Sequence, residues 1–310
     1  MIARPAGIRT SGLGGLRVRL GGVAAVALGG ALIGLAPIAV RLSEVGPLAT
    51  NLWRFLFALP ILALWAARSA PTARRDLFWL LAAGVLFGIE LNLWAIALTK
   101  TTVANATLLA NTTPVFAAAF GWFVFKERLG AGVLLGGLCA MIGAVLLTLG
   151  RAQTGVGPAD AEQGLIGDGL GLAAAVGYAG YLLIVRSLGS RVSVGAVMFW
   201  AGVSSAALTF VLCLITGERL FPHSVEGWAL LVGLGAFVQV GGQGLIAYGV
   251  GRLPIVISTV LLWTQPLAAA ALSWMLFSEA LGPVALIGAA LVLGGLYIVQ
   301  RARAPAPVHQ

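Results

Sequence analysis

Long apolar stretches alternate with short polar ones along almost all of the chain, which has 310 residues. Each apolar stretch is about 20 residues long, which is the length that an α-helix needs to cross roughly 30 Å of hydrocarbon. Ten of them can be placed, near residues 20–40, 48–67, 77–98, 103–124, 130–150, 169–186, 194–216, 227–249, 254–276 and 281–300. The pattern predicts an all-α polytopic membrane protein with ten transmembrane helices.

The polar segments are short, with one exception at the midpoint of the chain. Residues 151–168 contain Gly, Asp and Glu, and we predict a linker there. Residues 1–19 and 301–310 are predicted to be polar tails. The beginning of the chain is basic and then apolar, as in a signal peptide. Its apolar run is longer than such a peptide needs and nine more spans follow, so we interpret it as an uncleaved first helix.

The second half of the sequence repeats the first at an ungapped offset of 152 residues, the separation of Pro114 and Pro266. The segment LANTTP at 109–114 aligns with LLWTQP at 261–266, and Glu127 aligns with Glu279. The repeat predicts two five-helix units, 20–150 and 169–300. Because five is odd, the second unit must enter the membrane inverted relative to the first. Inverted repeats are typical of transporters, which place their substrate near the membrane midplane between the halves.

Composition excludes several other classes of protein. Hydrophobic residues make up 60% of the chain and charged residues 9%, whereas soluble domains carry about 25% charge. A water-soluble enzyme, a disordered chain and a disulfide-stapled domain are therefore excluded. The net charge of +9 does not indicate nucleic-acid binding, because the basic residues are scattered in the loops between apolar runs.

The basic residues also predict the orientation in the membrane. Of 19 Lys and Arg residues, Arg54 lies within a span and four lie on one side of the membrane, which leaves 14 on the side of both tails. The four are Arg41, Lys100, Arg151 and Arg219. Cytoplasmic loops carry the excess of positive charge. Both termini are therefore predicted to be cytoplasmic, and the linker 151–168 extracytoplasmic.

Cofactor chemistry is not indicated. The chain has no GxxxxGK[ST] phosphate-binding loop, so ATP hydrolysis is excluded. His223 and His309 lie outside the spans, and Cys139 and Cys213 fall inside apolar runs as small buried hydrophobic residues. We expect no metal, haem or other cofactor, and any transport must be driven by gradients.

Two charged residues lie inside predicted spans. Glu90 lies within the third span and Arg54 about seven residues into the second. An ionisable residue inside the membrane is expensive to bury unless it is paired, protonated or facing water. Either the two form an ion pair that supports helix packing, or they face a cavity in which Glu90 binds an ammonium group or a proton and Arg54 binds a carboxylate. Two opposite charges in one cavity would suit a zwitterion.

Pro114 and Pro266 lie near the middle of the fourth and ninth spans. A proline there leaves the carbonyl four residues earlier, that of Ala110 or Leu262, without its helical partner. Such carbonyls either bind substrate or are satisfied by nearby Thr and Asn side chains in a simple kink. In both cases the prolines are candidate hinges.

Polar and aromatic residues concentrate in the third, fourth, eighth and ninth spans, which are the predicted walls of a cavity. Such residues either join helices or contact a ligand. The candidate substrate-binding residues are Glu90, Arg54, Trp94, Asn111, Trp263, Gln265 and Tyr248.

Residues 102–114 (TVANATLLANTTP), 126–130 (KERLG) with the Gly-rich fifth span, and 278–282 (SEALG) resemble the duplicated EamA repeat of the drug/metabolite transporter superfamily. The resemblance covers about residues 23–298. It implies ten helices with both termini in the cytoplasm, and among bacterial members it is similar to inner-membrane amino-acid exporters. Relatives that carry phosphorylated cargo hold phosphate with cations on the eighth and ninth spans. Here only Arg252, at the membrane edge, is available there.

We therefore expect a secondary transporter, and no enzyme, in a bacterial inner membrane. Its expected substrates are small zwitterionic metabolites, chiefly neutral and aromatic amino acids. The alternatives are efflux of hydrophobic cationic drugs or export of another metabolite, and a membrane scaffold protein without transport. Its other expected partner is membrane lipid. Gly-rich spans five and ten are compatible either with a homodimer or with packing inside one chain.

Overall fold

The computed structural model describes residues 13–69, 72–125, 130–154, 160–250, 253 and 261–303. Within these ranges the regular elements are all helices. Nine helical stretches there are long and apolar enough to cross a membrane. The ninth predicted span, 254–276, lies partly outside the described residues, which include its second part, helix α13 (Thr264–Phe277). The predicted all-α polytopic fold is confirmed.

Several spans consist of more than one helix. The first half contains α1 (Leu13–Gly34), α2 (Ala36–Leu42), α3 (Pro47–Ala67), α4 (Arg74–Lys100), α5 (Val103–Ala110), α6 (Thr113–Phe125) and α7 (Ala131–Thr154). The second half contains α8 (Ala161–Leu188), the 3-10 helix η1 (Gly189–Arg191), α9 (Val194–Thr216), α10 (Val225–Gly233), the π-helix η2 (Leu234–Gly242), α11 (Gln243–Val250), α13 and α14 (Pro283–Arg303). The first, fourth and eighth spans are thus interrupted or change their helical geometry along their length.

The helices extend into the predicted linker from both sides. Helix α7 continues to Thr154 and α8 begins at Ala161, so residues 161–168 are helical, and 155–159 lie outside the described residues. Helix α8 begins there because the Asp160 side chain accepts a hydrogen bond from the Gln163 N–H at 2.8 Å, which caps its first turn. The predicted start of the sixth span at 169 is corrected accordingly. At the ends of the chain, α1 begins at Leu13 and α14 continues to Arg303, both within the predicted tails.

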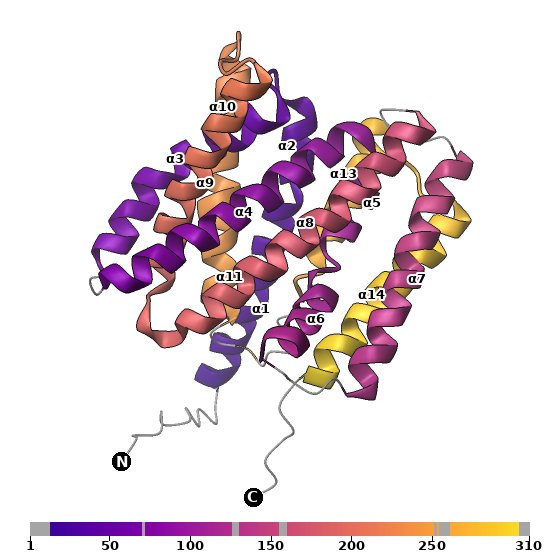
Figure 1. The fold of residues 1–310 in the computed structure, drawn as a ribbon, viewed down its shortest axis with the longest axis horizontal. Helices are drawn as coiled ribbons and strands as arrows, with labels where there is room; N and C mark the ends of the chain where they lie inside the picture. Colours follow the sequence, from indigo (N-terminus) through magenta and orange to yellow (C-terminus); the bar gives the residue numbers. More distant parts are fainter. Residues whose placement is uncertain are drawn as a thin grey trace, which may run out of the picture.

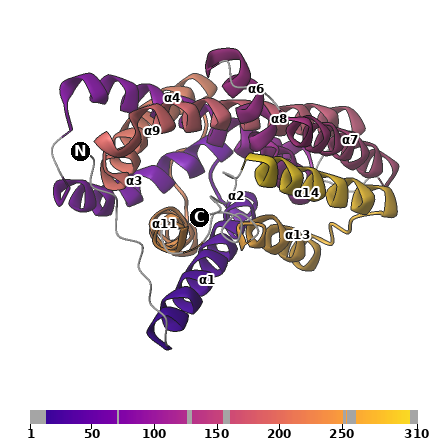
Figure 2. The same cartoon turned by 90° about the horizontal axis from the view of Figure 1, so that it is seen from below.

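Contacts between the halves follow a two-fold pattern. Helix α3 packs against α9, the second span of each half, and α7 packs against α14, the fifth span of each half. Helix α4 of the third span packs against α8 of the sixth, and the reciprocal pair, η2 and α11 against α1, also forms. Figure 1 shows α4 beside α8 and α7 beside α14. In Figure 2, α7 with α14 and α3 with α9 lie at opposite ends. This reciprocity supports two structural repeats related by a two-fold axis.

Helix α1 begins and α14 ends on the same side of the molecule, which we call the terminal side (Figure 1). The opposite side, where α2 and α4 end and α14 begins, is called the distal side.

Candidate functional site

A cavity of about 240 Å³ lies between the two halves of the protein. Its walls come from α1 to α6 in the first half and from α8, α11, α13 and α14 in the second. Eight of the residues selected from the sequence line it: Arg54, Glu90, Trp94, Asn111, Pro114, Trp263, Gln265 and Pro266. The ninth, Tyr248 on α11, does not line it, and its side chain is half exposed.

The two intramembrane charges face this cavity without pairing with each other. Among the described residues, no ion pair within 4.0 Å joins Arg54 to Glu90. Arg54 is 2% exposed, and its Nε donates to Gln239 Oε1 at 2.7 Å. Glu90 Oε2 is buried and has no hydrogen-bond partner in the part of the chain that the structure describes. A direct ion pair that would serve only packing is therefore not formed among the described residues. Arg54 and Glu90 still interact electrostatically, and each can contact a ligand of opposite sign.

Two more residues of the cavity wall carry an unpartnered acceptor. Thr107 Oγ1 on α5 and Gln300 Oε1 on α14 are buried without a hydrogen-bond partner among the described residues. Gln300 was not among the residues expected from the sequence. It continues a face formed by Leu293 and Leu296, at a spacing of three and seven residues along α14. That spacing is the signal that would have identified it.

The fourth and ninth spans are both interrupted where the sequence places the candidate hinges. Helix α5 ends at Ala110 and α6 begins at Thr113, and α13 begins at Thr264 after two turn residues. The Ala110 carbonyl accepts from Thr113 Oγ1 at 2.8 Å, and the Leu262 carbonyl accepts from the Gln265 N–H at 3.1 Å. Both carbonyls are satisfied locally, so their use as substrate ligands is not favoured. The interruptions themselves lie on the cavity wall.

Aromatic side chains form much of the remaining wall. Trp94 lies one turn from Glu90 on α4 and is 6% exposed. Trp263 packs edge-on against Tyr297, with ring centroids 6.1 Å apart. Phe87 and Tyr178 line the cavity, with ring centroids 6.2 Å apart. The cavity thus offers flat apolar surfaces in the same wall as its two charges.

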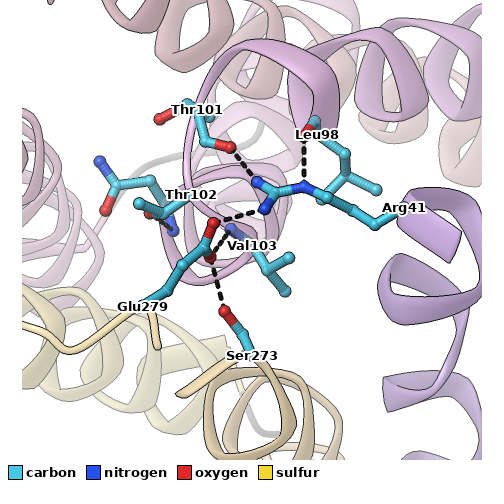
Figure 3. A network of polar contacts seen from close by, with 8 residues as sticks. Arg41, Leu98, Thr101, Thr102, Val103, Ser273 and Glu279 are labelled. Atoms are coloured by element: carbon cyan, nitrogen blue, oxygen red, sulfur yellow. Dashed lines mark hydrogen bonds and ion pairs between the residues drawn. The ribbon is translucent and has the colours of Figure 1, made fainter. Parts of the chain in front are cut away.

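A polar network joins the two halves on the distal side (Figure 3). Arg41 at the end of α2 forms an ion pair with Glu279, which follows α13, and donates to the carbonyls of Leu98 and Thr101. Glu279 also accepts from the Val103 N–H at 2.9 Å and from Ser273 Oγ at 2.6 Å. The Arg41 guanidinium lies 5.4 Å from the centre of the Phe277 ring.

This distal network lies about one helical turn beyond the cavity. Leu98 follows the lining residue Trp94 by four residues on α4, and Val103 precedes the lining residue Thr107 by four on α5. No residue of the network lines the cavity. The ion pair therefore holds the halves together between the cavity and the distal surface.

The two halves of this chain each match the same family of known proteins. A family model described as the EamA-like transporter family matches residues 20–149 and 165–301. Uncharacterized transporter YetK of Bacillus subtilis is 26% identical over 64% of this chain, and the match spans 60% of that relative's length. An uncharacterized transporter of Archaeoglobus fulgidus is 25% identical over 90% of this chain and 96% of the relative.

One relative is named for the compound that it exports. The pseudopaline exporter CntI of Pseudomonas aeruginosa is 22% identical over 79% of this chain and 82% of its own. A solved crystal structure is also similar, with a TM-score of 0.60 and 24% identity over 91% of this chain and 98% of that one. That similarity supports the fold alone.

Proposed function

This chain belongs to the EamA-like transporter family, whose members carry solutes across membranes and are not enzymes, and from this premise we propose that it exports small zwitterionic metabolites. Neutral and aromatic amino acids are the proposed substrates, and alternating access of the central cavity is the proposed mechanism. The observation that carries the proposal is the pair of opposite charges, Arg54 and Glu90, which face one cavity without pairing with each other.

Each charge suits one end of an amino acid. The Arg54 guanidinium offers a planar fork of N–H donors that matches a carboxylate. Glu90 offers a carboxylate oxygen without a donor, which suits an ammonium group. Trp94, Trp263 and Phe87 offer apolar surfaces for a side chain. Asn111 and Gln265 add amide groups to the same wall.

The size and charge of the cavity favour a small zwitterion over a hydrophobic cation. Its volume of about 240 Å³ is below the roughly 300–1,000 Å³ of sites for drug-sized ligands. A hydrophobic cation could use Glu90 and the aromatic wall, but Arg54 would repel it. Efflux of cationic drugs is therefore the second candidate. The pseudopaline exporter similarity supports export of metabolites without identifying the cargo here.

The orientation proposed from the loop charges places the terminal side in the cytoplasm of a bacterium, at its inner membrane. The cavity lining reaches Gln300, one turn before the end of α14 on the terminal side. On the distal side the Arg41–Glu279 network lies beyond it. From this orientation we propose that substrate enters the cavity from the cytoplasm.

The surroundings of the transporter are proposed from its surface. Leu134, Leu138, Ile142, Val145 and Leu149 of α7 are all at least 47% exposed, which suits contact with lipid chains or with a second copy in a homodimer. Gly136 and Gly143 of α7 instead face Gly295 and Gly288 of α14 within one chain.

Counterflow in proteoliposomes tests the proposed function. Liposomes preloaded with unlabelled neutral amino acids are expected to accumulate labelled phenylalanine, and empty liposomes are not. Preloading with a hydrophobic quaternary ammonium compound is expected to give no accumulation. The same assay is repeated with a labelled hydrophobic quaternary ammonium compound and the unlabelled cation inside. Accumulation of the labelled cation, without accumulation of phenylalanine, would establish the second candidate. No accumulation of either labelled compound, from protein shown to be folded, would contradict both.

The distal ion pair between Arg41 and Glu279 is expected to keep the cavity closed on the distal side. In Glu279→Gln, Arg41 stays buried near two carbonyls without its counter-charge, which costs up to about 3–5 kcal/mol for a buried pair. Opening of the distal side exposes Arg41 to water and removes this cost. We therefore expect the population that is open on the distal side to rise about tenfold, which needs only part of that free energy. An Asn111→Cys reporter, with Cys139 and Cys213 replaced by Ala, measures it as labelling from the distal side.

The control is Glu226→Gln, which changes an exposed carboxylate at the start of α10 on the distal side. It is expected to leave labelling unchanged. Equal distal labelling of Glu279→Gln and the parent, while the reporter still reacts from the terminal side, would mean that the ion pair does not control opening.

A further inference from the structure

Helix η2 is an unusual element within the eighth span. It keeps π-helical hydrogen bonding over nine residues, Leu234–Gly242, whereas π-helices mostly occur as single turns and often at functional sites. Glycines let it approach two neighbours closely. A Cβ on Gly235 would lie 3.1 Å from the Arg54 carbonyl oxygen, and one on Gly242 would lie 2.7 Å from Ile33 Cγ1. The segment is therefore wedged between α3 and α1.

Gln239 projects from η2 to Arg54. The Gln239 residue is 4% exposed, and its Oε1 accepts the Arg54 Nε–H at 2.7 Å. Among the described residues, Gln239 is the one whose side chain accepts a hydrogen bond from Arg54. Because a guanidinium is planar, a partner on Nε also sets the direction of the two terminal nitrogens. Arg54 lines the cavity, so these nitrogens remain for a ligand.

The neutrality of Gln239 matters as much as its position. A carboxylate at this place would pair with Arg54 and cancel its charge within the cavity wall. An amide oxygen orients the guanidinium and leaves its full positive charge for a ligand. The π-helical ladder sets where Gln239 points, since residues advance around a π-helix by a smaller angle than around an α-helix.

We infer that Gln239 is a positioning residue, which aims the Arg54 guanidinium so that its terminal N–H groups bind the carboxylate of the substrate. The inference rests on the proposed function and adds to it a residue that selects for a carboxylate. It separates this site from one that recognises only an amine.

Binding of a matched ligand pair tests the inference. Phenylalanine and phenethylamine differ by the carboxylate, and quenching of the intrinsic tryptophan fluorescence, to which Trp94 and Trp263 of the cavity contribute, reports binding of either in detergent. In Gln239→Met, which keeps the length of the side chain but removes the acceptor, the Kd for phenylalanine is expected to rise about tenfold, as for loss of one charge-assisted contact. The Kd for phenethylamine is expected to stay within about twofold of the parent.

Two further variants keep the test decisive. Gln239→Glu retains the hydrogen bond and adds a charge that competes for Arg54, so it too is expected to weaken phenylalanine binding selectively. Gln163→Met, at the start of α8 on the distal side, is expected to change neither Kd.

The outcomes separate the inference from the function on which it rests. If the parent binds phenylalanine and the Gln239 variants bind both ligands as it does, Gln239 does not position Arg54 and the proposed function stands. If both Kd values rise together, Gln239 only supports the fold, which also overturns the inference. If the parent binds neither ligand, the proposed function and the inference fail together.

Discussion

Replacing Glu90 by Gln is expected to lower amino-acid exchange by about 100-fold and to leave the protein folded. Glu90 lines the cavity, and its buried Oε2 has no hydrogen-bond partner in the described structure. In the proposed site, Glu90 makes a charge-assisted contact with the ammonium group of the substrate, which Gln cannot replace. Loss of such a buried contact costs about 3 kcal/mol, and each 1.4 kcal/mol is a factor of ten. Counterflow of labelled phenylalanine at several concentrations measures it.

The melting temperature of Glu90→Gln is expected to stay close to that of the parent. The substitution removes a buried carboxylate that has no direct ion-pair partner, and this gain offsets the loss of its electrostatic interaction with Arg54. Loss of exchange together with a lower melting temperature would instead indicate a structural role.

The matched control is Glu162→Gln, an exposed carboxylate in the first turn of α8. It is expected to exchange amino acids as the parent does. Undiminished exchange by Glu90→Gln, with an unchanged dependence on pH, would remove Glu90 both from ammonium recognition and from coupling to protons.

The spans could be predicted from the sequence because burial in lipid imposes a length and an apolar composition on each helix. Their ends could not be placed from hydropathy alone. Helix α8 begins at Ala161, in a segment polar enough to be interpreted as a linker, because capping by Asp160 supports a first turn that needs no apolar residues. The Asp160 and Gln163 pair, three residues apart, is the sequence signal that marks this start.

The two charged residues of the cavity could be predicted because an ionisable residue within a span is rare and must face something other than lipid. Gln300 could not be found this way, since it lies at the very end of the tenth predicted span, where a polar residue is ordinary. Tyr248 was selected by residue type, and α11 directs it away from the cavity.

The partner of Arg54 needed the structure. Whether Gln239 faces α3 depends on the π-helical hydrogen bonding of η2, and a helical wheel of 3.6 residues per turn assigns the wrong direction across such a segment. Sequence pattern thus locates the charges of a transport cavity more readily than the neutral residues that orient them.

Glycine-to-alanine substitutions at two positions of α7 are expected to have opposite effects on stability. Only one of the two positions contacts α14 closely. These two helices make the most extensive contact in the described structure, and it crosses the boundary between the repeats. A Cβ on Gly143 would lie 2.6 Å from the Gly288 carbonyl oxygen and 2.6 Å from the Val292 backbone nitrogen. Backbone atoms cannot move aside as a side chain can. Gly143→Ala must therefore separate the two helices.

Gly137 on the same helix offers the matched control. A Cβ there would meet only Val115 Cγ1 at 3.5 Å, which is ordinary van der Waals contact. Gly137→Ala is therefore expected to stabilise α7 through the higher helix propensity of Ala, by up to about 1 kcal/mol. Gly143→Ala receives the same gain but loses about 1–3 kcal/mol or more through overpacking.

We expect the melting temperature in detergent to fall by several degrees for Gly143→Ala and to stay level or rise for Gly137→Ala. Close approach of small residues is what drives helix association where lipid removes the hydrophobic advantage of burial. If both variants melted at the same temperature, the backbones of α7 and α14 would have to lie farther apart than the structure places them. The difference between the two variants therefore tests the packing that joins the two inverted repeats.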